Sequence, residues 1–452
     1  MATRDLTVGK PLPVLVKFSI PVICGNLFQL FYTLADSIIV GKAIGEDALA
    51  AVGATGVFVY FILCFIQGLT NGFSILLAQL FGFKDNDGVK KSIVASTYLS
   101  IFFAIVITIP ACLATGLVVR LMKVPQEITQ DAYVYLLIIV AGTGATIWYN
   151  MISNILRALG DSRTPLVYLV VSSLLNIVLD IVFIVPFKWG VAGAAYATVL
   201  SQLISAILCT ISAYRRFDQM HIEKALWRFD KEVLKRHFKL GFLMGFQMSV
   251  MCIGQLVMQS SVNAIGTSAI AGYTAATKVD QLSVLINNAF GMAIASYVAQ
   301  NYGAHLYGRI EQGTRASLIL VLSTDLAMAA IMLLVEPFVV PLFVTDPSPE
   351  VYDYARMFFQ VTLPFYPILG LILIYRTSIQ SMGISWAPFA SCIVELAARV
   401  CASLVLSRWF GYRGIVFSSP LAWIGSDLIV IPVYYMTMKR LRRKGEGDWS
   451  TS

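Results

Sequence analysis

Long apolar runs, each of twenty residues or more, recur along the whole 452-residue chain. A helix of about 20 apolar residues crosses the hydrocarbon core of a bilayer. The first run, from about 14 to 40, is too long for the core of a cleavable signal, so we expect it to be a membrane span. The runs are continuously apolar rather than alternating, which argues against the strands of a membrane barrel.

The sequence therefore predicts an all-α integral membrane protein. Only 13% of its residues are charged, about half the share typical of soluble proteins. Twelve spans are expected, at 14–40, 50–80, 92–117, 132–156, 165–186, 191–214, 237–262, 271–299, 314–337, 353–380, 386–407 and 414–437.

The positions of the basic residues predict the orientation in the membrane. The net charge is +8, but Lys and Arg lie between apolar runs, so we expect a bilayer partner and no nucleic acid. The termini and even-numbered loops hold most of them, whereas the odd-numbered loops hold six: Lys42, Arg120, Lys123, Lys188, Arg408 and Arg413. Both termini are therefore predicted to be cytoplasmic, in the inner (cell) membrane of a bacterium or archaeon.

Few residues suit covalent chemistry or a metal centre. All seven cysteines lie in apolar runs without a CxxC pair, which argues against disulfides and zinc. No HExxH motif or P-loop is present, and the three histidines, His221, His237 and His305, are predicted to lie in cytoplasmic loops. We therefore expect that the protein is not an enzyme and has no cofactor. An intramembrane enzyme is a remote alternative.

The second half of the chain repeats the first at an offset of roughly 221–223 residues. The segment IGEDALAAVGATG at 44–56 matches IGTSAIAGYTAAT at 265–277, and LRALGDSRTP at 156–165 matches IQSMGISWAP at 379–388. Six spans per repeat give both halves the same orientation, a parallel repeat known from transporters. We predict two six-helix lobes, 1–214 and 237–452, around a central cleft, joined by a basic cytoplasmic linker at 215–236. The second lobe ends in a basic tail.

Two acids lie deep in the spans of the first half. Asp36 lies in the first span and Asp180 in the fifth. Asn176 precedes Asp180 by one helical turn, Gln29 shares a face with Asp36, and Thr198 of the sixth span carries a hydroxyl that could reach them. Charged groups in hydrocarbon cost several kcal/mol, so these acids are predicted to be functional.

Such a group has two physical uses. A buried carboxyl beside a second one favours its neutral form and can hold a proton. The same oxygens can bind a hard cation such as Na⁺, for which the candidates are Asp36, Asn176, Asp180 and Thr198. Either use links charge to helix packing, and Pro21, which removes a backbone hydrogen bond from the first span, is the predicted hinge.

The second half carries different polar groups. Gln247 lies early in the seventh span, Glu395 and Arg399 lie one turn apart and are expected to pair, and Lys278 and Asp280 point in different directions. Asp325 and Asp427 are further buried candidates. We expect ion coupling in the first half.

Several residues could line a substrate cavity. An aromatic cavity suits a lipophilic cation, and the candidates are Phe28, Tyr32, Trp148, Tyr149, Tyr273, Tyr375, Asn150, Asn154 and Lys278.

The ordered set of spans and motifs resembles the multidrug and toxic compound extrusion (MATE) family over essentially the whole chain. The motifs are LADSIIVGKAIGEDALAAVG at 34–53, LRALGDSRTPL at 156–166, and NIVLD followed by GVAGAAYAT. The resemblance is closest to the prokaryotic branch with an N-lobe cation site, and it implies that Asp36, Asn176, Asp180, Thr198 and Gln29 serve that site and Pro21 the kink. Another branch of the family binds its cation with acids in the C-terminal lobe. Gln247 lies near the position of the seventh-span glutamate of that branch.

The resemblance implies antiport, in which Na⁺ or H⁺ enters while a drug-like, often cationic, compound leaves. The sequence does not choose between the two ions, and we expect a monomer. A flippase for lipid-linked oligosaccharides, from the same broad superfamily, is the alternative. Acids in the N-lobe favour a cationic ligand instead.

Overall fold

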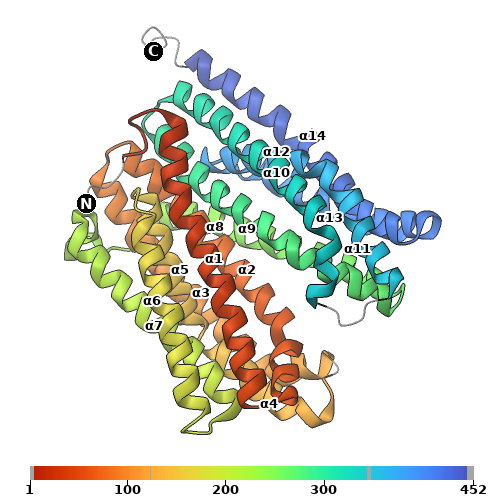
Figure 1. The fold of residues 1–452 in the computed structure, drawn as a ribbon. Coiled ribbons are helices and arrows are strands. Elements are labelled where there is room, and N and C mark those ends of the chain that lie inside the picture. The colour runs from red at the N-terminus through yellow and green to blue at the C-terminus, as the bar shows by residue number, and fades with distance from the viewer. Residues whose placement is uncertain (1–4, 123, 344–347, 445–452) are drawn as a thin grey trace. The chain divides into compact units, whose positions relative to one another are not determined.

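The computed structural model describes residues 5–122, 124–343 and 348–444, and all regular structure in these ranges is helical (Figure 1). Lys123, counted above among the odd-loop cations, lies outside them. The helices are α1 (Pro11–Ala43), α2 (Glu46–Gly82), α3 (Asn86–Leu121), α4 (Thr129–Ala141), α5 (Thr143–Ala158), α6 (Arg163–Ile184), α7 (Gly190–Arg216), α8 (Lys231–Asn263), α9 (Thr267–Gly303), α10 (Tyr307–Phe343), α11 (Pro349–Thr362), α12 (Tyr366–Ser381), α13 (Trp386–Phe410) and α14 (Tyr412–Lys444), with short 3-10 turns at η1 (Gln126–Ile128), η2 (Asp218–Met220), η3 (Lys224–Leu226) and η4 (Leu363–Phe365).

The predicted spans are confirmed as helices, but two of them are broken. Among the described residues eleven helical segments are long and apolar enough to cross a membrane, and α4 with α5 forms a twelfth that bends by 42°. The bend lies at Gly142, where a β-carbon would come within 2.3 Å of Val199, so only glycine allows this approach to α7. The tenth span is interrupted by η4 between α11 and α12; Pro364 in η4 and Pro367 in the first turn of α12 each remove a backbone donor.

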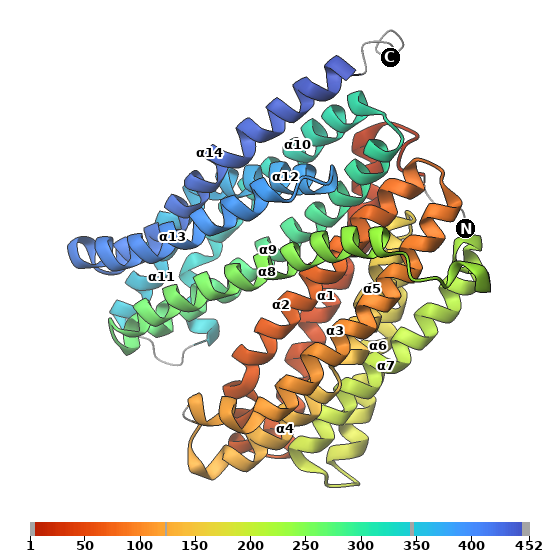
Figure 2. The same cartoon turned by 180° about the vertical axis from the view of Figure 1, so that it is seen from behind.

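Contacts divide the described chain into two compact units. The first comprises residue 5 and residues 20–248, and the second comprises residues 6–19 and 249–444. The predicted lobes, 1–214 and 237–452, are defined by the sequence repeat and not by contacts. They therefore stay a prediction. In the first unit α6 packs along α7, and in the second α13 packs along α14 (Figures 1 and 2).

The first unit contains a close helix crossing built from glycines. A β-carbon on Gly68 would lie 2.4 Å from the Met244 carbonyl oxygen, and one on Gly72 would lie 2.5 Å from Cα of Gly241. Glycines four residues apart allow two backbones to approach closely in a membrane, where packing rather than water drives helix association. This crossing fixes the first half of α8 against α2.

The segment between α7 and α8 is shorter than the predicted linker. Helix α8 begins at Lys231 because Asp230 Oδ1 accepts from the backbone N–H groups of Glu232 and Val233, at 3.1 and 3.2 Å. The expectation that His237 lies in a loop is therefore wrong. Its ring is buried in α8, with Nε2 2.7 Å from Ser92 Oγ and Nδ1 2.8 Å from the Val233 carbonyl oxygen.

Candidate functional site: a pair of buried carboxyls

The two acids predicted in the first half come together in the first unit. Asp36 of α1 and Asp180 of α6 lie close enough for their carboxyl groups to interact electrostatically. Asp180 is fully buried and Asp36 is partly buried. Residues on two separate helices thus form one polar group inside an apolar bundle.

Asn176 and Thr198 extend this group. Asn176, one turn before Asp180 on α6, donates from Nδ2 to Thr198 Oγ1 of α7 at 3.5 Å. The Thr198 hydroxyl donates in turn to the Ala194 carbonyl oxygen at 3.1 Å. The close packing of α6 on α7 therefore brings together the amide and the hydroxyl that the sequence placed on neighbouring spans.

Four oxygens of this group are buried without a hydrogen-bond donor in the described structure: Asp36 Oδ1, Asn176 Oδ1 and both carboxylate oxygens of Asp180. No Lys or Arg of the described ranges forms an ion pair with either acid. Buried polar atoms normally find a partner, so an unpaired set calls for an explanation. Oxygens of carboxylates, amides and hydroxyls suit a proton or a hard cation.

Two tyrosines lie beside the acids. Tyr32, one turn before Asp36 on α1, is within electrostatic range of both carboxyls. Tyr135 of α4 is in the same range and packs on the apolar cluster of Val40, Ile184 and their neighbours. The sequence analysis missed Tyr135, because no pattern in the fourth span indicates that it faces α1.

The other predicted members, Gln29 and Pro21, lie on α1, as Asp36 does. Gln29 is exposed, and so is Phe28, at 45%. Pro21, the hinge candidate, is buried. The helix that contains it, α1, is continuous. The roles assigned to these residues remain predictions.

The fourth-span cavity candidates are engaged with their own unit. Tyr149 donates its hydroxyl to the Pro165 carbonyl oxygen at 3.2 Å, and Asn150 donates to the Thr146 carbonyl oxygen at 2.9 Å. Asn154 is buried: its Nδ2 donates to Thr70 Oγ1 at 3.0 Å, and its Oδ1 accepts from the Arg157 guanidinium at 2.8 Å. Trp148 donates to Thr210 Oγ1 at 3.1 Å.

The second-half cavity candidates differ among themselves. Tyr273 is buried in the apolar core of the second unit, with its ring 5.6 Å from that of Phe358. Lys278 is exposed. Tyr375 is buried and its hydroxyl lies 3.1 Å from that of Tyr435.

The expected pair of Glu395 and Arg399 exists, at 2.9 Å, but it is part of a larger network. Arg376 of α12, which the sequence analysis missed, donates to Glu395 Oε2 at 2.7 Å and to Ser426 Oγ at 2.8 Å. All three ionised side chains are buried. One carboxylate thus holds two guanidinium groups and ties α12, α13 and α14 together.

Two further acids of the second unit accept from neutral donors. The Tyr366 hydroxyl donates to Asp280 in a short contact, and Asn287 donates from Nδ2 to Asp325 Oδ1 at 2.8 Å. Asp427, also predicted, is buried with one carboxylate oxygen unpartnered in the described structure, and Gln247 is buried in α8. Among the described residues no group of three His, Cys, Asp or Glu could hold a metal ion.

Comparisons with known proteins agree with this architecture. The MatE family model matches residues 21–182 and 244–405, once in each half. The chain is 29% identical over 438 residues to the probable multidrug resistance protein YpnP of Bacillus subtilis, which covers 96% of this chain and 97% of that protein. It is 25% identical over 442 residues to the probable multidrug resistance protein NorM of Thermotoga maritima, covering 94% and 91%.

Solved structures show the same fold. A crystal structure of MATE in the bent conformation has a TM-score of 0.90 at 25% identity, over 98% of this chain and 99% of that one. A MOP superfamily transporter from Pyrococcus furiosus has a TM-score of 0.89 at 25% identity, over 98% and 100%. Both halves of the chain, and therefore both compact units, have counterparts in these structures.

Proposed function

The chain belongs to the MatE family of multi-pass membrane transporters, and from this premise we propose that it is a secondary antiporter that exports small cationic organic compounds in exchange for Na⁺ or H⁺. The observation that carries the proposal is the unpaired group of oxygens at Asp36, Asn176 and Asp180. Relatives named as multidrug resistance proteins support a small organic substrate.

The charge of the acid pair supports a cation as the coupling ion. Two carboxylates side by side repel each other, and burial adds the cost of losing water around each charge. A proton or Na⁺ taken up between them cancels one of the two charges, which relieves the repulsion and reduces the buried charge from −2 to −1. Because no fixed cation of the described residues pairs with the acids, a mobile cation is the natural partner.

Coupling to transport requires that the ion favour one conformation over another. A ligand shifts a conformational equilibrium only by its differential affinity for the two states, and a shift from 1:99 to 99:1 takes about 5.5 kcal/mol. Asp36 and Asp180 lie on different helices, so a bound ion bridges α1 and α6 and can supply such a difference. We infer that ion binding repacks α1 about Pro21 and displaces the substrate outward.

The test is transport of a fluorescent cationic dye by the purified protein in proteoliposomes. Imposed Na⁺ and pH gradients are compared in separate runs, for the natural protein and for Asp36→Asn. We expect one gradient to drive dye movement and Asp36→Asn to lose the gradient-driven component. Undiminished transport by Asp36→Asn contradicts the proposal, and movement of a lipid-linked oligosaccharide in place of the dye favours a flippase.

The control is Asp47→Asn, because Asp47 lies in the first turn of α2, outside the acid pair. It removes the same charge and should transport the dye like the natural protein.

A further inference from the structure

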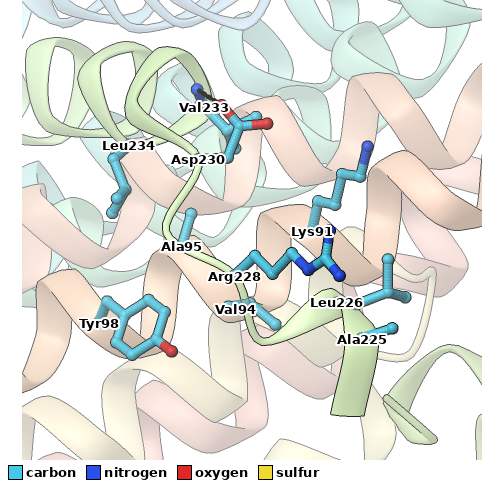
Figure 3. A pocket seen from close by; sticks show the side chains of 10 residues that line it. All are labelled: Lys91, Val94, Ala95, Tyr98, Ala225, Leu226, Arg228, Asp230, Val233 and Leu234. Carbon is cyan, nitrogen blue, oxygen red and sulfur yellow. Dashed lines mark hydrogen bonds between the residues drawn. The ribbon is translucent and has the colours of Figure 1, made fainter. Parts of the chain in front are cut away.

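A pocket of about 300 Å³ lies in the first unit, between α3 and the segment that leads into α8 (Figure 3). Ten residues line it: Lys91, Val94, Ala95 and Tyr98 of α3, and Ala225, Leu226, Arg228, Asp230, Val233 and Leu234. Its lining combines two cations with an apolar wall. The pocket lies apart from Asp36 and Asp180, since it shares no residue with them.

Two cations and one acid line the pocket, so its lining has a net positive charge. Neither Lys91 nor Arg228 forms an ion pair in the part of the chain that the structure describes. The pocket's one acid, Asp230, is used by the backbone N–H groups of Glu232 and Val233. Figure 3 shows Arg228 extending along the pocket toward Lys91. The pocket therefore presents unbalanced positive charge.

Two exposed aromatic side chains pack on Tyr98, which lines the pocket. Trp227 is 44% exposed and Phe229 is 69% exposed, on either side of Arg228. Tyr98 packs on both rings, at 5.9 and 6.3 Å between centroids, and donates its hydroxyl to the Trp227 carbonyl oxygen at 3.3 Å. Exposed Trp beside basic residues at the end of a span is typical of the membrane interface.

The second unit has a different arrangement at the position that corresponds to Trp227. At the offset of 221 residues, Trp227 corresponds to Leu6. Leu6 is buried in the second unit, where its N–H donates to Gln300 Oε1 at 3.0 Å and its carbonyl oxygen accepts from Asn301 Nδ2 at 3.2 Å. In the second unit this position is thus a buried leucine, whose carbonyl oxygen also accepts from Arg309 Nη2 at 3.4 Å.

We propose that this pocket binds the phosphate-bearing headgroup of an anionic membrane phospholipid. The cations bind the phosphate, and the wall of Val94, Ala95 and Leu234 contacts the start of an acyl chain. Basic pockets between spans on the cytoplasmic side bind anionic headgroups, and the count of Lys and Arg predicts that this end of α3 and α8 is cytoplasmic. A bound lipid would fix the segment between the two halves of the chain against α3.

The experiment measures lipid binding to the full-length protein in detergent by native mass spectrometry. Phosphatidylglycerol and phosphatidylcholine are titrated separately, with inorganic phosphate as a competitor in a third series. The natural protein should bind phosphatidylglycerol more tightly than phosphatidylcholine, and Lys91→Gln with Arg228→Gln should weaken phosphatidylglycerol binding about 30-fold, since each basic group near an anionic lipid contributes about fivefold.

The matched control is Lys224→Gln with Lys235→Gln, which removes two charges from exposed positions in η3 and in the first turns of α8 that do not line the pocket. Its affinity should stay within about twofold of the natural protein's, because those charges lie outside the headgroup site. Equal losses in both double variants, or no preference between the two lipids, would overturn the proposal. Displacement of the lipid by millimolar inorganic phosphate would assign the site to free phosphate instead.

Discussion

The two units differ in the partners of their buried carboxylates. In the second, Glu395 is held by Arg376 and Arg399 at 2.7 and 2.9 Å, so its charge is neutralised by fixed partners. In the first, Asp36 and Asp180 have each other but no cation of the described residues. A carboxylate that is already paired with fixed cations is stabilised little by an ion from solution. A carboxylate without such partners is stabilised when it binds one. The same residue type can therefore stabilise packing in one unit and exchange cations in the other.

Asp280 and Asp325 lie between these extremes. Each accepts from a neutral donor, Tyr366 or Asn287, which satisfies an oxygen without cancelling a charge. Asp325 Oδ2 has no partner in the described structure and lies where a β-carbon on Gly370 would come within 2.6 Å. The backbone of α12 thus packs closely against this acid.

The largest effect is expected for Glu395→Gln. Removing one partner of a buried ion pair typically costs about 3–5 kcal/mol, because the other charge is left uncompensated, and here two guanidinium groups are left. The Tm of the protein in detergent should fall markedly. The control is Glu311→Gln, whose partners Arg315 and Arg442 are more than half exposed, so a change within about 1 kcal/mol is expected.

The outcome also tests the comparison between the units. If Glu395→Gln kept its Tm but lost dye transport, the network would be a functional site rather than a structural one. The distinction between the two units would then fail.

Helical spacing explains why much of the acid pair could be predicted. Asn176 and Asp180 lie one turn apart, so their shared face follows from the sequence, and the packing of consecutive spans brings Thr198 to them. Arg376 could not be predicted, because a lone arginine in an apolar run gives no sign that its partner lies on the next helix. The bend at Gly142 was missed for a similar reason, since it depends on contact with Val199 of α7.

An intermediate effect is expected for a double-mutant cycle across the acid pair. If Asp36 and Asp180 share one coupling ion, each Asn substitution weakens binding of that ion to the purified protein, and the double variant should bind it little worse than the single ones. The interaction free energy from these ion-binding affinities should then be about 0.5–3 kcal/mol, as for residues in one network. Additive losses would mean that the carboxyls act separately.

The stability of these variants provides the contrast with Glu395. Asp36→Asn relieves a like-charge contact, so its Tm should be unchanged or higher. A large fall in Tm would show that the acid pair, like the network of the second unit, mainly stabilises packing.

The smallest effect is expected for Thr198→Val. This change keeps the shape of the side chain but removes the oxygen that accepts from Asn176 Nδ2 at 3.5 Å. A bond of that length is weak, and a typical net hydrogen bond contributes about 0.5–1.5 kcal/mol, so the apparent affinity for the coupling ion should fall about three- to tenfold with the maximal dye efflux unchanged. Thr210→Val on the same helix is the matched control, because Thr210 accepts from Trp148 and not from the acid group. A lower maximal rate at saturating ion in Thr198→Val, with unchanged affinity, would place Thr198 in the conformational step rather than in the ion site.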